Sequence, residues 1–121
     1  MISCLIVDDS VPYLQVASRS LRRGGVTVVG TASTVEGALR QAHNLRPNVV
    51  LIDVMLGSQS GLDLAQRLAE TGLESTLILI STHDPADFAE LPAEMHVAGF
   101  VPKSKLSADA IRRLVSGPRD T

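Results

Sequence analysis

Apolar and polar residues are arranged in alternating blocks along this chain. Five short apolar runs read ISCLIV, VTVVGT, NVVLID, TLILIS and VAGFV, and the segments between them carry apolar residues at helical spacing. Short apolar runs predict strands, and the longer periodic segments predict helices. Because the two kinds of segment alternate, we expect an α/β fold of the (βα)5 type, a doubly wound five-stranded parallel sheet between helices.

The first predicted helix has clear signals at both ends. Ser10 is a candidate N-cap, and the glycines at 24 and 25 should end the helix. Between them, apolar and small residues at helical spacing are expected to form a buried stripe: Val11, Leu14, Ala17, Ser18 and Leu21.

The other helices are marked by capping residues and prolines. Residues 33–36 and 60–63 have the spacing of capping boxes, so the second and third helices are expected to begin there. A short fourth helix is expected over residues 84–92, which start with Asp-Pro and end at a second proline. Ser107 should cap the last helix, which is expected to end near Gly117.

Length and composition indicate one domain. A chain of 121 residues with 45% hydrophobic residues can bury roughly two thirds of its unfolded surface in one core. We expect residues 1–117 to form this domain and residues 118–121 to be a flexible tail or the start of a linker. Cys4 is the one cysteine and lies in the first apolar run, so a disulfide framework is excluded and a buried, reduced thiol is expected.

Charge and targeting signals narrow the possible partners. A net charge of −2 and a pI of about 5.8 give no basic footprint for nucleic acid, so this chain alone is not expected to bind DNA. The amino terminus lacks the basic region of a signal peptide, and no apolar run approaches the roughly 20 residues that span a bilayer. The sequence therefore predicts a cytoplasmic protein without a membrane segment.

Polar residues follow four of the predicted strands directly: Asp8, Asp9, Asp53, Ser81, Thr82 and Lys103. The carboxyl ends of parallel strands meet at one edge of the sheet, and such folds place their ligand sites there. These residues, although far apart in the sequence, are therefore expected to gather at one edge.

The three carboxylates of this set predict a magnesium site. Carboxylates held close together repel and raise one another's pKa unless a hard cation lies among them. Mg²⁺ is usually held by one or two carboxylates together with water and phosphate oxygens. A carboxylate beside the metal can attack a phosphoryl group to form an aspartyl phosphate, and a lysine and a hydroxyl can then bind the phosphoryl oxygens.

The motifs around these residues resemble those of a known family. In this order and spacing, LIVDDS, VVLIDVML, SGLDLAQRL, LILIST and GFVPKS are similar to motifs of the receiver domain of bacterial two-component response regulators, over residues 1 to about 117. The resemblance implies a flavodoxin-like architecture, Mg²⁺ as the cofactor and a sensor histidine kinase as the phosphodonor.

The resemblance also implies roles for five residues at the predicted site. Asp53 is implied as the phosphoacceptor. Asp8 and Asp9 are implied to hold Mg²⁺ together with Asp53, and the backbone carbonyl of Met55 is implied as a further ligand. Lys103 matches the family's phosphate-binding lysine.

Three further residues match the switch region of the family: Ser81, Thr82 and Phe100. Phosphorylation is expected to draw Ser81 toward the phosphoryl group and Phe100 inward. This movement is expected to change an interaction face formed by the predicted helix over 84–92, the strand VAGFV and the last helix. A homodimer is expected to use either that face or a face formed by the first and last helices.

Two residues depart from the pattern of the family. Gly57 stands where proline is usual, so the loop after Asp53 is expected to be more mobile than in relatives. Thr82 stands where a smaller residue is usual, and its bulk is expected to slow the entry or loss of the phosphoryl group.

Four other functions are alternatives to this one. A receiver-fold scaffold that works without phosphorylation stays open, and so does the receiver half of a helix-turn-helix transcription regulator. A Mg²⁺-dependent phosphohydrolase would need a substrate pocket, and the sequence has no insertion to build one. A nucleotide or flavin module would need a glycine-rich loop where this chain reads DDSVPY. We therefore expect a signalling switch rather than an enzyme.

Overall fold

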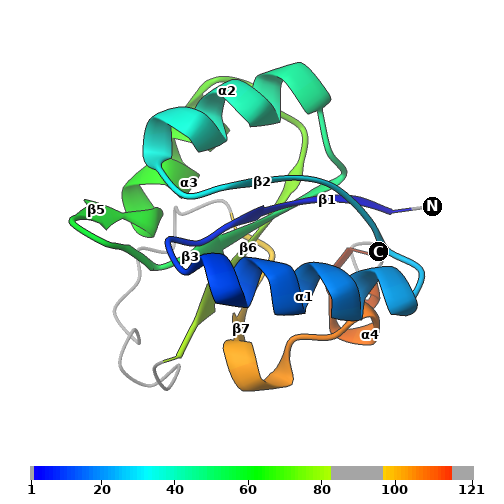
Figure 1. The fold of residues 1–121 in the computed structure, drawn as a ribbon. Helices are drawn as coiled ribbons and strands as arrows, with labels where there is room; N and C mark the ends of the chain where they lie inside the picture. Colours follow the sequence, from blue (N-terminus) through cyan, green and yellow to red (C-terminus); the bar gives the residue numbers. More distant parts are fainter. Residues whose placement is uncertain (1, 83–96, 116–121) are drawn as a thin grey trace.

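A parallel sheet forms the centre of the molecule. The computed structural model describes residues 2–82 and 97–115, and within them the five strands of this sheet run in the order β2-β1-β3-β6-β7 (Figure 1). All of its neighbouring strands pair in parallel. The strands are β1 Ser3–Val7, β2 Thr27–Ala32, β3 Val49–Asp53, β6 Thr76–Ser81 and β7 Gly99–Pro102. The predicted five-stranded parallel sheet is confirmed.

Helices cover both faces of this sheet. Figure 1 shows α1 and α4 on one face and α2 and α3 on the other, and the two core clusters divide in the same way. The helices are α1 Val11–Arg23, α2 Val35–Leu45, α3 Gly61–Glu70 and α4 Ala108–Val115, and a short 3-10 helix, η2 Lys103–Lys105, follows β7. The doubly wound arrangement predicted from the alternation of elements is therefore confirmed.

Strand β3 is buried on both faces. Val50 and Ile52 pack into the cluster beneath α2 and α3, whereas Val49 and Leu51 pack into the cluster beneath α1 and α4. Every residue of the strand is buried because it lies between β1 and β6 and beneath two layers of helices. Neighbouring strands on both edges and helices on both faces therefore fix the backbone that leads to Asp53.

Cys4 belongs to the core, as expected. It is fully buried in the cluster beneath α1 and α4, and burial raises the pKa of its thiol to about 12. A thiol that stays protonated has little nucleophilic reactivity.

Capping residues set the helix bounds largely as predicted. Ser10, Ser60 and Ser107 each accept a hydrogen bond from the backbone N–H three residues later. The prediction for the second helix is wrong by one residue, because Thr34, not Ser33, is its N-cap. With the helix beginning here, the side chain of Val35 packs into the core, and the residue is 3% exposed.

The predicted buried stripe of α1 is correct except at its first residue. Leu14, Ala17, Ser18 and Leu21 are buried, as expected. Val11 is 56% exposed, because it begins the helix and lines the open cleft between α1 and α2.

A small hairpin follows β3 and was not predicted. Strands β4 Met55–Leu56 and β5 Gln59–Ser60 pair antiparallel around Gly57 and Ser58. Strands of two residues are too short to show an alternating pattern, so the sequence suggested only a loop. The greater mobility expected of this loop from Gly57 stays a prediction.

Some sequence predictions lie outside the described residues. These are the helix expected over 84–92, the end of the last helix near Gly117 and the tail or linker over 118–121. Among the helices that are described, none has the length and apolar character needed to cross a membrane.

Candidate phosphorylation site

The ends of four strands bring the predicted residues to one edge of the sheet. Asp8 follows β1, Asp53 ends β3, Ser81 ends β6 and Lys103 directly follows β7. The strand register places Asp53 beside Ile80 and Ser81 beside the proline that precedes Lys103. The expected gathering at the carboxyl edge is therefore observed.

Three carboxylates form a tight cluster at this edge. One carboxylate oxygen each from Asp8, Asp9 and Asp53 lie within 4.8 Å of one another. Asp8 is fully buried and Asp53 is 6% exposed, whereas Asp9 is exposed. Like charges at this separation repel, most strongly where water is excluded. The cluster therefore favours a cation.

Lys103 supplies one positive charge to the cluster. Its Nζ lies 2.5 Å from Asp8 Oδ2 and 3.3 Å from Asp53 Oδ2. Burial lowers the pKa of the Lys103 ammonium, but the two carboxylates outweigh this effect and raise the pKa overall. Lys103 is therefore charged, and it compensates only part of the negative charge.

The hydrogen bonds to the carboxylates leave an oxygen free to bind a metal ion. The N–H of Ser10 donates to Asp8 Oδ1 at 2.8 Å, and the N–H of Met55 donates to Asp53 Oδ1 at 3.3 Å. Asp8 Oδ2 is buried and, despite its ion pair with Lys103, accepts no hydrogen bond of good geometry from the described residues. A buried oxygen of this kind beside two other carboxylates fits a hard divalent cation.

Asp53 is in an environment that disfavours its charge. Burial first, and then the charge of Asp8, raise the pKa of the Asp53 carboxyl, while Lys103 and the N–H of Met55 act in the opposite direction. A cation bound to the cluster would relieve this penalty. The carboxylates present are therefore suited to Mg²⁺.

Gly61 allows α3 to begin directly against the backbone of Asp53. Its N–H donates to the carbonyl of Val54 at 2.8 Å, and a Cβ at this position would collide with the carbonyl of Asp53. The sequence analysis missed this role, although a glycine directly after the N-cap Ser60 was the available signal. Gly61 therefore belongs to the structure that holds Asp53 in place.

The turn of the β4–β5 hairpin explains why Gly57 replaces proline. Gly57 has φ +63°, a conformation open to glycine but closed to proline, whose ring fixes φ near −65°. A Cβ at Gly57 would lie 3.6 Å from Asp9 Oδ2. The departure from the family pattern thus lies next to the carboxylate cluster.

The remaining predicted site residues lie around the cluster. Met55 is 54% exposed, and Ser81 is buried at the end of β6. Thr82 is exposed, and Phe100, which is half-buried, packs against the core beneath α2 and α3. Their locations agree with the predicted roles, while the roles themselves and the Met55 carbonyl as a ligand stay predictions.

Tyr13 is a site residue that the sequence analysis missed. The Lys103 Nζ lies over its ring, 4.4 Å from the centroid. Burial, and then the charges of Asp8 and Asp53, raise the pKa of the Tyr13 phenol to about 12. An aromatic residue in the first turn of a helix is usually read as packing, so only the fold reveals this contact.

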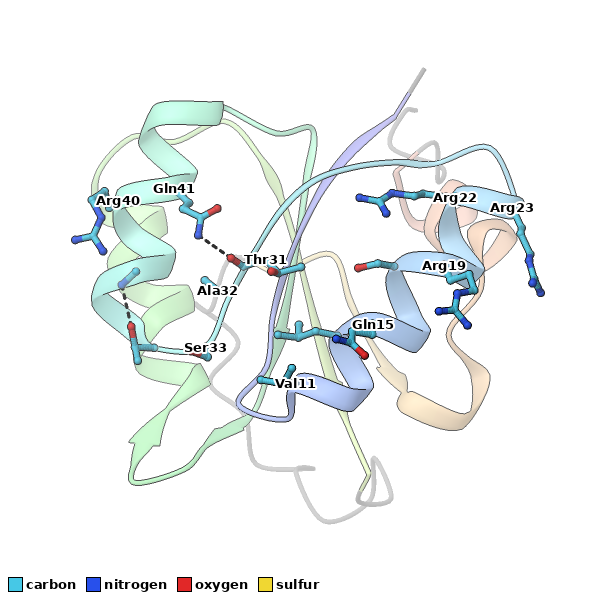
Figure 2. A pocket seen from close by; sticks show the side chains of 14 residues that line it. Val11, Gln15, Arg19, Arg22, Arg23, Thr31, Ala32, Ser33, Arg40 and Gln41 are labelled. Carbon is cyan, nitrogen blue, oxygen red and sulfur yellow. Dashed lines mark hydrogen bonds between the residues drawn. The ribbon is translucent and has the colours of Figure 1, made fainter.

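A separate cleft lies between α1 and α2, away from the carboxylates. It has a volume of about 1130 Å³, and none of the predicted site residues lines it (Figure 2). Two of the side chains that line it bind the backbone of β2: Arg22 donates to the carbonyl of Val28 at 3.3 Å, and Gln41 donates to that of Thr31 at 2.6 Å. These side chains cap carbonyls of β2 at the sheet edge, which hinders pairing with another strand.

Comparisons with known proteins identify similar chains. The family model for the response regulator receiver domain matches residues 4–115. The response regulator GacA of Pseudomonas viridiflava is 29% identical, over 98% of this chain and 58% of its own length. The transcriptional regulatory protein YvfU of Bacillus subtilis is 32% identical, over 78% of this chain and 48% of its own. This chain thus spans about half the length of the curated relatives it matches.

A solved structure shows the same likeness. The signal receiver domain of NarL from Mycobacterium tuberculosis matches with a TM-score of 0.85 and 25% identity, over 96% of this chain and 97% of that one. The likeness therefore covers nearly the whole of both chains.

Proposed function

Because this chain belongs to the response regulator receiver domain family, we propose that it is switched by transfer of a phosphoryl group to Asp53. The observation that carries the proposal is the position of the Asp53 carboxylate. It ends a strand buried on both faces, and it meets Asp8, Asp9 and Lys103 at that point. A nucleophile held this firmly is suited to in-line attack.

The contacts of Asp53 suggest how the transfer proceeds. The N–H of Met55 holds Oδ1, and Lys103 faces Oδ2. A carboxylate oxygen forms a bond to phosphorus while the bond from phosphorus to the donor breaks, and the donor leaves with that electron pair. Lys103 then binds a phosphoryl oxygen and offsets its charge.

The acidic residues would hold Mg²⁺ for this step. Asp8, Asp9 and Asp53 would be its protein ligands, with the backbone carbonyl of Met55 as a fourth. When bound, the cation neutralises charge on the carboxylates and on the transferred phosphoryl group. In its absence, Lys103 balances only part of the buried negative charge.

A phosphoryl group acts as a switch only if it contacts two conformations of the protein differently. In the proposal Ser81 moves to donate to a phosphoryl oxygen, and Phe100 turns further into the core. Converting a nearly inactive population into a nearly active one takes about 5.5 kcal/mol of differential interaction. A few charge-assisted hydrogen bonds at Asp53 can supply this energy.

The partners and output of the switch are inferred from the family. A sensor histidine kinase is the proposed phosphodonor, in the cytoplasm, and the protein passes on the signal without turning over an external substrate. A homodimer through the face of β7 and α4 with the predicted helix over 84–92, or through α1 and α4, belongs to the same proposal. A second candidate is the receiver half of a transcription regulator, favoured because relatives named as regulators are about twice as long.

Intact-mass spectrometry tests the phosphoryl transfer. The protein is incubated with acetyl phosphate, with Mg²⁺ or with a chelator. The proposal predicts one added phosphoryl group that requires Mg²⁺. No adduct under either condition would contradict the proposal and favour the scaffold that works without phosphorylation.

Met55 is expected to prolong the life of the phosphoaspartate. Met55 is 54% exposed, two residues after Asp53, and a thioether is a weak hydrogen-bond partner for a hydrolytic water. Met55→Asn should speed phosphate loss about threefold or more, because an amide can orient that water. The decay of the intact-mass adduct after removal of acetyl phosphate measures this rate. Slower decay in Met55→Asn would contradict the prediction.

Thr82 is expected to restrict access to the site. It is exposed and directly follows Ser81, so removing its branched side chain should widen the approach. Thr82→Ala should raise the rate of phosphorylation, dephosphorylation or both by about twofold to fivefold. This is the change expected if the activation free energy falls by about 0.5–1 kcal/mol. Time courses of the adduct measure both rates. If both are unchanged, Thr82 does not restrict access.

A further inference from the structure

The ring of Tyr13 and the ammonium of Lys103 form a contact that the proposed mechanism does not use. Lys103 Nζ lies 4.4 Å from the centroid of the ring, within the roughly 6 Å over which a cation is attracted to an aromatic face. The Lys103 side chain is 12% exposed, so this contact is largely shielded from water. Attraction of this type is strongest where both groups are desolvated.

We propose that Tyr13 is a positioning residue whose ring face holds Lys103 at the phosphorylation site. The proposal rests on the proposed function of Asp53. Lysine has a long, flexible stem that loses rotamer freedom when its ammonium is fixed, so the ammonium needs several contacts to remain in one place. Among the described residues, Lys103 has contacts with Asp8, Asp53 and the ring of Tyr13.

The ring differs from the carboxylates in one respect that matters for phosphorylation. Asp8 and Asp53 would also hold the cation, and Asp53 would carry the phosphoryl group, so their attraction for Lys103 falls when the site is loaded. The ring of Tyr13 has no such second role. It therefore holds Lys103 at the step where this lysine must meet a phosphoryl oxygen.

Two hydrogen bonds through Ser10 connect the backbone of Tyr13 to the carboxylate of Asp8. The N–H of Ser10 donates to Asp8 Oδ1 at 2.8 Å, and the N–H of Tyr13 donates to the Ser10 hydroxyl at 3.4 Å. The N-cap of α1 thus links the backbone of Tyr13 to the carboxylate of Asp8. These hydrogen bonds therefore fix the position of Tyr13 relative to the acidic cluster.

The hydroxyl of Tyr13 is not the part that holds Lys103. It is buried and makes no hydrogen bond within residues 2–82 and 97–115. The phenol pKa of about 12 keeps the ring neutral near pH 7. The contact is therefore with the aromatic face, and phenylalanine should replace tyrosine without loss.

The first test compares variants of Tyr13 by the rate of phosphorylation from acetyl phosphate with Mg²⁺. Tyr13→Phe should retain the wild-type rate, and Tyr13→Leu should lower it about fivefold to tenfold, as expected for a partly desolvated cation–π contact. In a Lys103→Ala background, the leucine substitution should have no further effect. Equal rates for the leucine and phenylalanine variants would overturn the proposal.

A second test separates the aromatic face from simple packing. Phenylalanine analogues with increasing numbers of ring fluorines are placed at position 13. They keep nearly the same shape but lose the negative potential of the ring face. The proposal predicts a stepwise fall in rate across the series, whereas a packing role predicts a constant rate.

A third measurement does not depend on phosphorylation. In NMR spectra, the methylene protons next to Lys103 Nζ should show a ring-current shift in wild type and Tyr13→Phe that is lost in Tyr13→Leu. If the shift is present but wild type takes up no phosphoryl group, the proposed function fails although the contact exists. If wild type is phosphorylated but the shift is absent, only the role of Tyr13 is overturned.

Discussion

Asp53→Asn is expected to abolish phosphoryl uptake and, in metal-free buffer, to stabilise the fold. The Asp53 side chain is 9% exposed and close to Asp8, so its charge is unfavourable in the folded state. An asparagine oxygen can still accept from the N–H of Met55, and Lys103 keeps its ion pair with Asp8. We expect the free energy of unfolding to rise by about 1–3 kcal/mol, which corresponds to a rise of a few degrees in melting temperature.

This gain should depend on pH in a defined direction. The pKa of Asp53 is raised in the folded protein from an ordinary value of 3.8. The folded state therefore binds a proton more tightly than the unfolded state, and wild-type stability falls as pH rises from about 3.8 through the folded pKa. Asp53→Asn does not lose stability in this way. The difference in free energy of unfolding between the variant and wild type should therefore be small at pH 3.5 and largest above the pKa of Asp53 in the folded protein.

Asp63→Asn is the matched control for this experiment. Asp63 is an exposed aspartate on α3 that pairs with Arg67 at 3.9 Å, so its substitution should leave phosphoryl uptake intact and change stability by less than about 0.5 kcal/mol. Thermal melts in chelator across pH, together with intact-mass assays, measure both properties. Loss of stability in Asp53→Asn at neutral pH would show that its charge is compensated in the folded protein.

Gly61→Ala is expected to have the largest effect of any substitution outside the acidic cluster. The new Cβ would meet the carbonyl of Asp53, which is backbone and cannot turn aside. Although alanine is the better helix former, we expect a loss of about 3 kcal/mol in the free energy of unfolding. Because the collision displaces Asp53 itself, the phosphorylation rate should fall on the order of a hundredfold.

Gly37→Ala controls for the change of glycine to alanine. Gly37 lies within α2, and its new Cβ would lie 3.1 Å from the hydroxyl of Thr34, a side-chain atom that can shift. Stability should change by less than about 1 kcal/mol, since the gain in helix propensity offsets the close contact. Denaturant unfolding and acetyl phosphate assays compare the two variants. Equal effects would mean that α3 does not constrain Asp53 through Gly61.

The pattern of the sequence was sufficient to predict the five-stranded parallel sheet and the helices α1, α2, α3 and α4 because each of these elements carries its own signal. The run from Val49 to Ile52 has no polar position, which is typical of a strand covered on both faces. The rule that parallel strands end at one edge then predicted that Asp8, Asp53 and Lys103 lie close together. The burial of each strand is thus encoded locally, and the common edge follows from the parallel arrangement, whereas the order of the strands came from the structure.

The features that the sequence did not reveal depend on contacts between distant elements. Gly61 is required because α3 approaches the backbone of Asp53, and no pattern of residue types reports that distance. Tyr13 looks like packing until the fold brings Lys103 over its ring. Val11 has the right spacing for the buried stripe, but nothing in its neighbours along the chain shows that the cleft leaves it uncovered.

Locating the phosphoryl group tests the role of Asp53 most directly. Wild-type protein is incubated with acetyl phosphate and Mg²⁺, reduced with borohydride, which converts an aspartyl phosphate to homoserine, and digested for tandem mass spectrometry. We expect homoserine at position 53 alone, and none without acetyl phosphate or in Asp53→Asn. Homoserine at Asp8 or Asp9, or no homoserine in a protein that carries the added mass, would contradict the assignment.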